Sequence, residues 1–311
     1  MPTTDGEHER DLPMETSTAM SIDLDLKNSS TGHRTTAIVC LLVMSLALRP
    51  GIVSIGPLLL EIRRNFALTY SEASLMTSIP DLCMGLFVLF VPRISQILGL
   101  NRTITASLVL LGAAILLRAT AHSTQALLIH TTLIGIGIAI AGALIGGWIK
   151  GNFPEESSLF MGIYAGGLSV GSTITAVATS HIAEKFGGWR VGSGAWCIVA
   201  VAAVASWMYL TRHFEAMAGA GAGTTPKAEV SSTIKLPWFN RRAWLLAIFF
   251  GLCQFIAYAC IAWTAPWNSE VHASKIPGGE MLSLFMLFLA AGTFAEAVFG
   301  GAPDDRRLSL M

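Results

Sequence analysis

The sequence predicts an all-α integral membrane protein, a bundle of spanning helices, and three observations support this fold class. Of the 311 residues, 53% are hydrophobic and only 13% are charged, whereas soluble domains carry roughly 25% charged residues. The mean hydropathy is +0.60. Eight apolar segments are suited to crossing a bilayer, which takes about 20 mostly apolar residues. The formal net charge is zero, so the composition gives no sign of a nucleic-acid partner.

The predicted elements begin after a polar segment. Residues 1–34 are polar, acidic and rich in Ser and Thr, so we expect a disordered tail that cannot bury enough apolar surface to fold. The spanning helices are expected at residues 35–60, 72–92, 103–121, 125–149, 157–183, 191–210, 243–267 and 279–301. One connection, residues 211–242, is long, basic and rich in small residues, which is typical of a linker. The sequence therefore predicts a six-helix N-terminal bundle over residues 35–210, a linker, and two helices of a partial C-terminal bundle within residues 243–311.

The distribution of Lys and Arg predicts the orientation, because cytoplasmic loops of membrane proteins carry an excess of both. If the N-terminus lies in the cytoplasm, the segments on that side hold thirteen of these residues and the segments outside hold six. The linker alone contributes five of the thirteen. We therefore expect a multi-pass protein of the cell (inner) membrane with both ends in the cytoplasm.

Two spans carry faces of small residues. One reads "GIGIAIAGALIGG" from Gly135 and the next reads "GIYAGGLSVGS" from Gly162. Small residues at such spacings let membrane helices approach closely, so we expect these faces to pack against other helices. Glycines at these positions could also permit the bending that a transport cycle requires.

Enzyme motifs are missing from the sequence. It contains no paired acidic motif such as DDxxD, no HExxH, no GxSxG and no GxxxxGK[ST] loop. We therefore expect no enzymatic activity, no cofactor, no metal site and no nucleotide site. A transporter without an ATP site works passively or runs on a gradient, with the proton as the candidate coupling ion.

Two charged residues lie well inside predicted spans, where each costs a few kcal/mol on insertion scales. At 1.5 Å per residue, Arg49 lies about 16 Å and Asp81 about 14 Å from the outer end of its span. Because consecutive helices with a short connection usually pack together, these charges have matching depths on neighbouring helices. They could form an ion pair, or Arg49 could bind an anion in a central cavity while Asp81 tunes it. Arg118, near the end of its span, is expected to reach the interface by snorkelling.

Other polar and aromatic residues complete the predicted substrate site. Gln254 and Tyr258 are four residues apart, so they share one face of a helix. We expect them to line the cavity together with Trp148, Tyr164 and Trp263. The two tryptophans could equally belong to the aromatic belts at the membrane interfaces.

Several local motifs resemble those of a known family. Six spans, a long loop and further spans are the layout of the major facilitator superfamily. The stretches "LRPGIVSIGPLLLEIRRNFALT", "LMTSIPDLCMGL", "WIKGNF", "FGGWR" and "RAWLLAIFFGL" are similar to its branch of cyanate permeases and 2-nitroimidazole transporters. The resemblance runs from about residue 37 to the last residue. It implies a secondary active transporter that carries a small solute, anionic or neutral, such as cyanate, by alternating access. Asp81 departs from the family pattern, which is usually apolar there.

The resemblance also implies gating residues. The final residues "DDRRLSLM" are similar to the family's loop between helices eight and nine, where an acid followed by arginines forms a conformational latch. The implied latch residues are Asp304, Asp305, Arg306 and Arg307 and, in the equivalent loop of the first half, Arg93 and Arg102. Because the family continues for four more helices, we expect a truncation after the eighth helix. The alternative function is therefore a non-transporting membrane protein, either truncated or a fragment of a twelve-helix permease.

Overall fold

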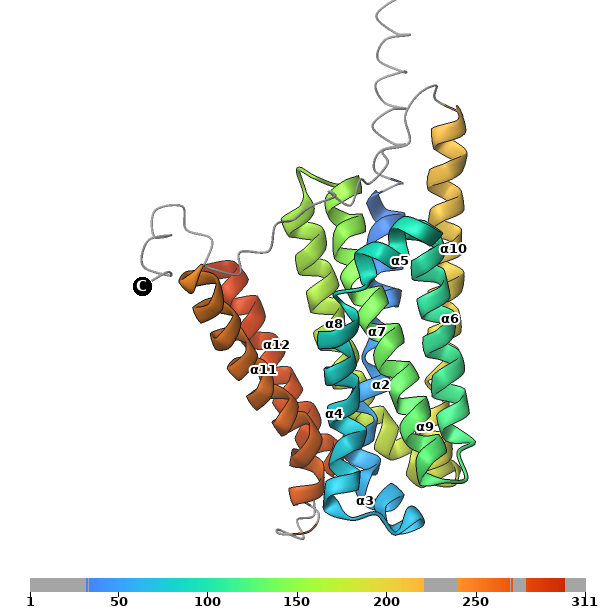
Figure 1. Ribbon diagram of the computed structural model, residues 1–311, viewed down its shortest axis with the longest axis vertical. Coiled ribbons are helices and arrows are strands. Elements are labelled where there is room, and N and C mark those ends of the chain that lie inside the picture. Colours follow the sequence, from blue (N-terminus) through green and yellow to red (C-terminus); the bar gives the residue numbers. More distant parts are fainter. Residues whose placement is uncertain (1–31, 33, 221–239, 269, 271–277, 300–311) are drawn as a thin grey trace, which may run out of the picture. The chain divides into compact units, whose positions relative to one another are not determined.

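The computed structural model describes residue 32 and residues 34–220, 240–268, 270 and 278–299 (Figure 1). All regular structure in these residues is helical, so the predicted all-α fold class is confirmed. The chain divides into two units, Met1–Val39 and Cys40–Met311. In the first unit, residues 34–39 are helical, and Thr36 Oγ1 donates a hydrogen bond to the Gly32 carbonyl oxygen (2.9 Å). The predicted N-terminal tail otherwise lies outside the described residues.

In the second unit, residues 40–48 continue the first helix. The elements that follow are α2 (Pro50–Val53), α3 (Ile55–Phe66), α4 (Tyr70–Phe87), α5 (Val91–Leu98), α6 (Leu100–Ala119), α7 (Thr124–Asn152), α8 (Ser157–Phe186), α9 (Trp189–Gly194), α10 (Cys197–Ala220), α11 (Arg241–Trp267) and α12 (Gly278–Phe299). We call the run Arg34–Phe66, which contains α2 and α3, helix one.

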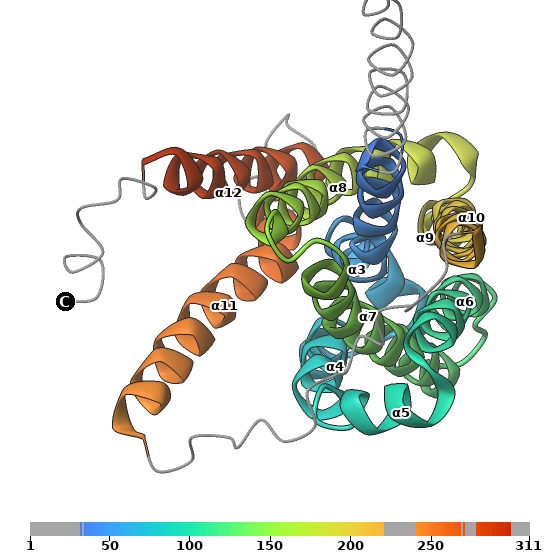
Figure 2. The same cartoon turned by 90° about the horizontal axis from the view of Figure 1, so that it is seen from above.

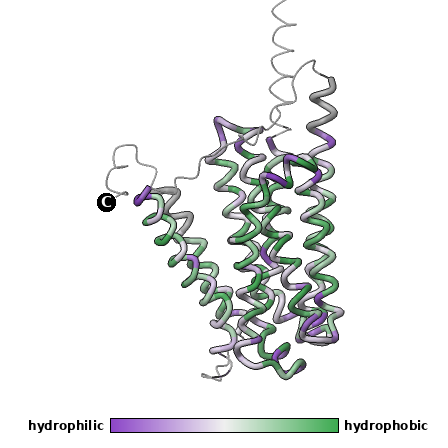
Figure 3. Tube along the Cα trace, in the orientation of Figure 1, coloured by the Kyte–Doolittle hydropathy of each residue, from purple (hydrophilic) through white to green (hydrophobic). Residues whose placement is uncertain are grey.

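The long helices among the described residues are apolar enough to be membrane spans (Figure 3). Six of them are long and apolar enough to cross a bilayer, and a seventh crossing results if α4 and α5, bent by 66°, form one span. The part of α12 that enters this comparison, Gly278–Gly292, is apolar but shorter. The eighth span, and with it the division into a six-helix and a two-helix part, stays a prediction.

Two helices run past their predicted ends. Helix one continues to Phe66 instead of ending near residue 60, and α10 continues to Ala220 instead of ending near residue 210. The extension of α10 includes Ala, Met and Glu, which favour helix. The predicted linker therefore begins within a helix, and its residues 221–239 lie outside the described residues.

The turn from helix one into α4 is set by local chemistry. Ala67 ends α3 in the left-handed conformation, with φ of 50°. Thr69 then caps α4: its hydroxyl oxygen accepts from the Glu72 amide (3.2 Å), and the Glu72 carboxylate accepts from the Thr69 amide (2.9 Å). This reciprocal capping box satisfies two amide groups that a helix start leaves without partners.

The motif FGGWR has a structural explanation between α8 and α9. Gly187 and Gly188 have φ of 105° and 95°, a region that residues with a Cβ rarely adopt. This turn directs the amide of Trp189 to the carboxylate of Glu61 on helix one (3.0 Å). A Cβ on Gly188 would lie 2.6 Å from the same carboxylate. The two glycines therefore let the start of α9 pack against helix one.

The small-residue faces are packing faces, as predicted. Figure 2 shows α7 with α4 on one side and α6 on the other, and both helices pack against it. A Cβ added to Gly137 would lie 3.0 Å from the Ser107 carbonyl oxygen of α6. On α8, a Cβ added to Gly171 would lie 3.1 Å from the Leu46 Cα of helix one. At these points a Cβ would fit only if the neighbouring helix shifted by a few tenths of an ångström.

Candidate functional site

Arg49 lies at a short interruption of the regular helix within helix one, which we call the break, although its backbone keeps right-handed helical angles (φ −82°, ψ −35°). It precedes α2, whose first residue is Pro50. Because proline has no amide hydrogen, it removes one hydrogen bond from the helix. The Arg49 side chain is half-buried, and its Nε atom is buried without a hydrogen-bond partner. This guanidinium nitrogen is therefore covered by the protein without a hydrogen bond.

Asp81 and Tyr164 are the predicted site residues that lie within the electrostatic reach of Arg49. Asp81 follows Pro80 on α4, and its Oδ1 atom is buried without a hydrogen-bond partner. The Arg49 charge acts on the Asp81 carboxyl and on the phenol of Tyr164, which is 8% exposed on α8. Arg49 and Asp81 both belong to the described residues, and no ion pair within 4.0 Å joins them. The two charges therefore interact across a separation that leaves an atom of each unsatisfied.

Arg118 does not snorkel to the interface, and that prediction is wrong. Its side chain is 0% exposed; Nη1 donates to the Gly51 carbonyl oxygen (2.8 Å) and Nη2 to Ser54 Oγ (3.2 Å). The reason is α9, which packs over the end of α6: Arg190 Nη1 donates to the Ala119 carbonyl oxygen (2.9 Å). The position of Arg118 near the end of its span therefore did not indicate how deeply its side chain is buried.

The predicted site residue Trp148 belongs to an aromatic cluster. It is 4% exposed on α7. Its ring packs edge-on against Trp207, with centroids 5.4 Å apart, and against Phe153 at 6.0 Å. The indole Nε1 of Trp207 donates to the Asn101 carbonyl oxygen (3.2 Å). These contacts make Trp148 part of the packing between α6, α7 and α10.

The predicted site residues on α11 have different environments. Gln254 is exposed. Tyr258 is half-buried against an apolar cluster of helix one, α8, α11 and α12, which consists of Val53, Ala176, Ile261, Leu282 and Met286. Trp263 is also half-buried and packs against the apolar cluster around the end of helix one. The structure thus brings none of the three into a described contact with Arg49, and their role in a substrate site stays a prediction.

The predicted latch is described only in part. Arg93 on α5 and Arg102 on α6 are exposed. The other four predicted latch residues, Asp304–Arg307, lie outside the described residues. The cytoplasmic latch therefore stays a prediction.

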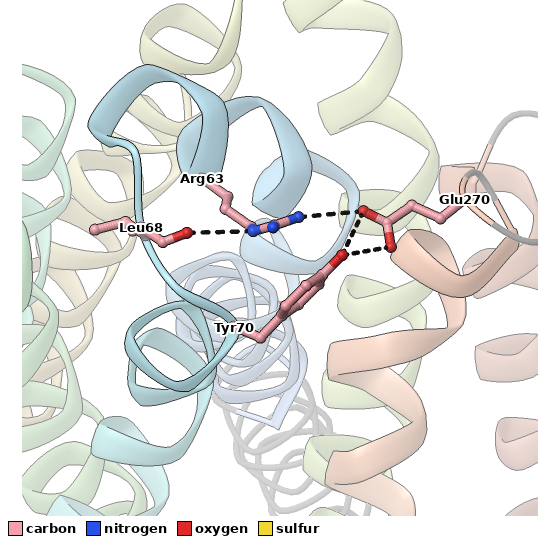
Figure 4. Close-up of polar contacts among 4 residues, drawn as sticks. All are labelled: Arg63, Leu68, Tyr70 and Glu270. Atoms are coloured by element: carbon pink, nitrogen blue, oxygen red, sulfur yellow. Dashed lines mark hydrogen bonds and ion pairs between the residues drawn. The ribbon is translucent and has the colours of Figure 1, made fainter.

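A polar cluster that the sequence did not indicate joins helix one, α4 and the end of α11 (Figure 4). Arg63 Nη1 lies 3.3 Å from Glu270 Oε1, and the Arg63 guanidinium lies 3.6 Å from the centre of the Tyr70 ring. The Tyr70 hydroxyl donates to the same carboxylate, 3.1 Å from Oε2. Arg63 Nε also donates to the Leu68 carbonyl oxygen (3.2 Å). We call Arg63, Tyr70 and Glu270 the Arg63 cluster.

The backbone of α11 also comes close to helix one. A Cβ added to Gly56 would lie 2.7 Å from the Ile261 carbonyl oxygen. Along α11, residues 261, 262, 265 and 266 are buried, whereas residues 244–256 are exposed. The described part of α11 therefore packs on the preceding helices through its C-terminal portion.

No set of three His, Cys, Asp or Glu side chains among the described residues is close enough to hold a metal ion. Arg49, Asp81 and Tyr164 carry charged and hydrogen-bonding groups.

The chain was compared with known proteins. A family model described as Major Facilitator Superfamily matches residues 33–311. The chain belongs to the major facilitator superfamily. It is 28% identical over 274 residues to the cyanate transport protein CynX of Escherichia coli (strain K12), covering 88% of this chain and 69% of CynX. The 2-nitroimidazole transporter of the same organism is 24% identical, covering 88% of this chain and 68% of that protein. The predicted resemblance to this branch of the superfamily is confirmed.

Another relative is named as an uncharacterized transporter, YycB of Bacillus subtilis (strain 168). It is 30% identical over 261 residues, which are 84% of this chain and 62% of YycB. The chain thus spans about two thirds of the length of these relatives or somewhat less. Among solved structures, the chain matches a bacterial homologue of the human lysosomal transporter Spinster, at a TM-score of 0.63 and 16% identity, covering 86% of this chain and 63% of that one. This likeness supports the major facilitator fold.

Proposed function

We propose that this multi-pass membrane protein is a permease that carries a small anion such as cyanate by secondary active transport, and that it is not an enzyme. Arg49 is the proposed anion-binding residue. The proposed location is the inner membrane, with both ends in the cytoplasm. The relationship to transporters supports the general class, and the choice of an anion depends on the charges around the break in helix one.

The observation that carries the proposal is an excess of positive charge in the interior. Arg49, Asp81 and Arg118 each hold a buried polar atom without a hydrogen-bond partner, and two of the three carry positive charge. Arg118 bonds to Gly51, whose Cα lies at most about 7 Å from that of Arg49 because two residues span no more. The three groups keep an excess positive charge whether Asp81 is ionised or protonated. Because an uncompensated charge inside a membrane is costly, a bound anion would stabilise this arrangement.

Asp81 is the proposed site of the coupling proton. When its carboxylate is ionised, its negative charge offsets part of the attraction of Arg49 for a bound anion. When it is protonated, the carboxyl group is neutral and no longer offsets the attraction of Arg49 for the anion. The proton and the anion would therefore bind together and move in the same direction. Other titratable groups on helices packed against α4 include His130 on α7, whose Nδ1 is buried without a partner, and Tyr258 on α11. The same helices also carry Lys150 on α7, Glu61, Arg63 and Arg64 on α3, and Arg241, Arg242, Cys253 and Cys260 on α11.

Alternating access requires contacts that form and break at the two membrane faces. In the predicted orientation the Arg63 cluster faces the outside, and we propose that it holds the outer ends of helix one and α11 together. The close approach of Gly56 to Ile261 supports closure at this end. The predicted latch residues in the cytoplasmic loops would act at the opposite face.

Ligand binding to the purified 311-residue chain in lipid nanodiscs tests the proposal. Isothermal titration calorimetry would use cyanate, thiocyanate and nitrate as anions and 2-nitroimidazole as the uncharged comparison. We expect the anions to bind and Arg49→Gln to weaken them by about tenfold or more, as loss of a charged hydrogen-bond donor predicts. Arg64→Gln, which removes an exposed arginine from the same helix, is the matched control and should leave affinity unchanged.

Each alternative has its own outcome. Binding of 2-nitroimidazole in preference to the anions would replace the anion with a neutral solute. Folded protein that binds none of the four compounds would favour the non-transporting alternative. In weakly buffered solution, cyanate binding should take up protons in the wild type and not in Asp81→Asn. Equal proton uptake by both proteins would remove Asp81 from the coupling.

A further inference from the structure

The break in helix one is held from outside the helix by a side chain of α6. Within the break, the amides of Ile52 and Val53 both donate to the Arg49 carbonyl oxygen, at 3.1 and 3.0 Å, and the Ser54 amide donates to the Pro50 carbonyl oxygen at 3.3 Å. Ser54 separates α2 from α3. The segment between Arg49 and Ser54 is thus a short, nearly helical stretch between two interruptions of the regular helix, and it begins at the proposed anion-binding residue.

Arg118 bridges two residues of this segment with one guanidinium. Nη1 donates to the Gly51 carbonyl oxygen (2.8 Å) and Nη2 donates to Ser54 Oγ (3.2 Å). The Ser54 hydroxyl in turn donates to the Pro50 carbonyl oxygen (2.5 Å). The planar guanidinium holds its donors in a rigid fork, so it fixes the relative positions of the groups that it bridges.

The same segment is tightly packed from α7. A Cβ added to Gly51 would lie 2.6 Å from Ile134 Cγ2 and 3.1 Å from Ile138 Cδ1. Helix one therefore has little room to shift on this side at Gly51. A backbone that is packed on one side and bridged by Arg118 has a defined geometry two residues away, at Arg49.

We propose that Arg118 is a positioning residue for the anion site. It holds the segment from Pro50 to Ser54 in the conformation that presents Arg49, and its own charge, which no acidic side chain among the described residues pairs with, adds to the attraction for an anion. This inference rests on the proposed anion-binding function. It assigns Arg118 a role through the backbone of helix one, since its guanidinium is fully covered.

The sharpest variant is Ser54→Ala, which removes one acceptor of Arg118 and leaves the arginine in place. Its matched control is Ser107→Ala: both serines are buried and donate to a backbone carbonyl of their own helix, and Ser107 bonds to Ile104 rather than to Arg118. We expect Ser54→Ala to weaken cyanate binding on the order of fivefold, the effect of one hydrogen bond of ordinary strength. Ser107→Ala should leave the affinity within about twofold of the wild type, because its lost bond is local to α6.

Two substitutions at Arg118 separate the effect of its two-acceptor hydrogen-bond geometry from the effect of its charge. Arg118→Lys keeps the charge but cannot bridge two acceptors in the same way, whereas Arg118→Gln loses both. We expect cyanate to bind more weakly to the lysine variant than to the wild type, and more weakly still to the glutamine variant. Equal affinities of the lysine variant and the wild type would overturn the positioning role.

Hydrogen exchange of the amides in residues 50–58 provides a readout that does not depend on a ligand. It should accelerate in Ser54→Ala and stay unchanged in Ser107→Ala. If the wild type binds no anion, the proposed function fails, and accelerated exchange still supports the hold of Arg118 on helix one. Unchanged exchange together with unchanged cyanate affinity in Ser54→Ala would overturn the inference, even if Arg118→Gln fails to fold.

Discussion

Replacing Gly135 with alanine should destabilise the contact that places Asp81. The new Cβ would lie 2.7 Å from Pro80 Cα and 2.9 Å from Cys83 Cβ, whereas ordinary van der Waals contact begins at 3.4 Å. Because the nearest atom is backbone, α4 and α7 would have to separate by about 0.7 Å, and such overpacking costs about 1–3 kcal/mol. Alanine is favoured over glycine in a helix by about 0.8–1.0 kcal/mol. The expected net loss is therefore about 0–2 kcal/mol relative to the wild type, and about 1–3 kcal/mol relative to a glycine-to-alanine change that meets no steric contact.

Thermal unfolding of the protein in detergent measures this effect. For a chain of this size we expect a shift in midpoint on the order of 2 °C per kcal/mol. Gly162→Ala on α8 is the matched control, since its Cβ would meet nothing within 4 Å, and it should be neutral or stabilising by up to about 1 kcal/mol. A Gly135→Ala protein that is as stable as Gly162→Ala would refute the argument from close packing. Because Asp81 lies between the two contacted residues, Gly135→Ala should also weaken cyanate binding.

Three further predictions concern single interactions. Arg49→Gln and Asp81→Asn should be non-additive in thermal stability by about 0.5–3 kcal/mol in a double-mutant cycle, and simple additivity would mean that the two charges do not interact. Arg63→Gln should lower stability by about 0.2–1 kcal/mol, because its ion pair is partly exposed; an equal loss in Arg64→Gln would show a general charge effect instead. Gly188→Ala should cost about 1–3 kcal/mol, because its φ of 95° strains any residue with a Cβ; an unchanged unfolding midpoint would contradict this.

The sequence indicated the central charges because they conflict with their surroundings. Arg49 and Asp81 stand in apolar segments where an ionisable group is costly. That conflict is visible without a structure, and matched positions on consecutive helices placed the two residues near each other. Their interaction without an ion pair depends on side-chain directions, which the spacing of residues cannot supply.

Contacts between segments that are distant in the sequence were not predictable in the same way. Arg63 and Glu270 are 207 residues apart, and each resembles an ordinary charged residue at the end of an apolar helix. Neither carries the signal of a charge at bilayer depth, so no local pattern pointed to their contact. Trp148 shows an ambiguity of residue type, because an aromatic residue suited to a cavity also suits the aromatic cluster in which it packs. Its role in a substrate site stays a prediction.

Arg118 connects the missed contacts with the predicted site. A helix that only had to cross the membrane would be more stable without Pro50 and Gly51, because both disfavour a continuous helix, and without a buried arginine next to them. In the structure all three residues meet in one segment: Pro50 and Gly51 lie at the break, and Arg118 donates a hydrogen bond to Gly51. Stability alone does not explain the combination, because apolar residues in a regular helix would satisfy every backbone group at lower cost. A site that holds positive charge at a defined point of helix one would explain it, and this is the role that the proposed anion-binding function assigns to Arg49 and Arg118.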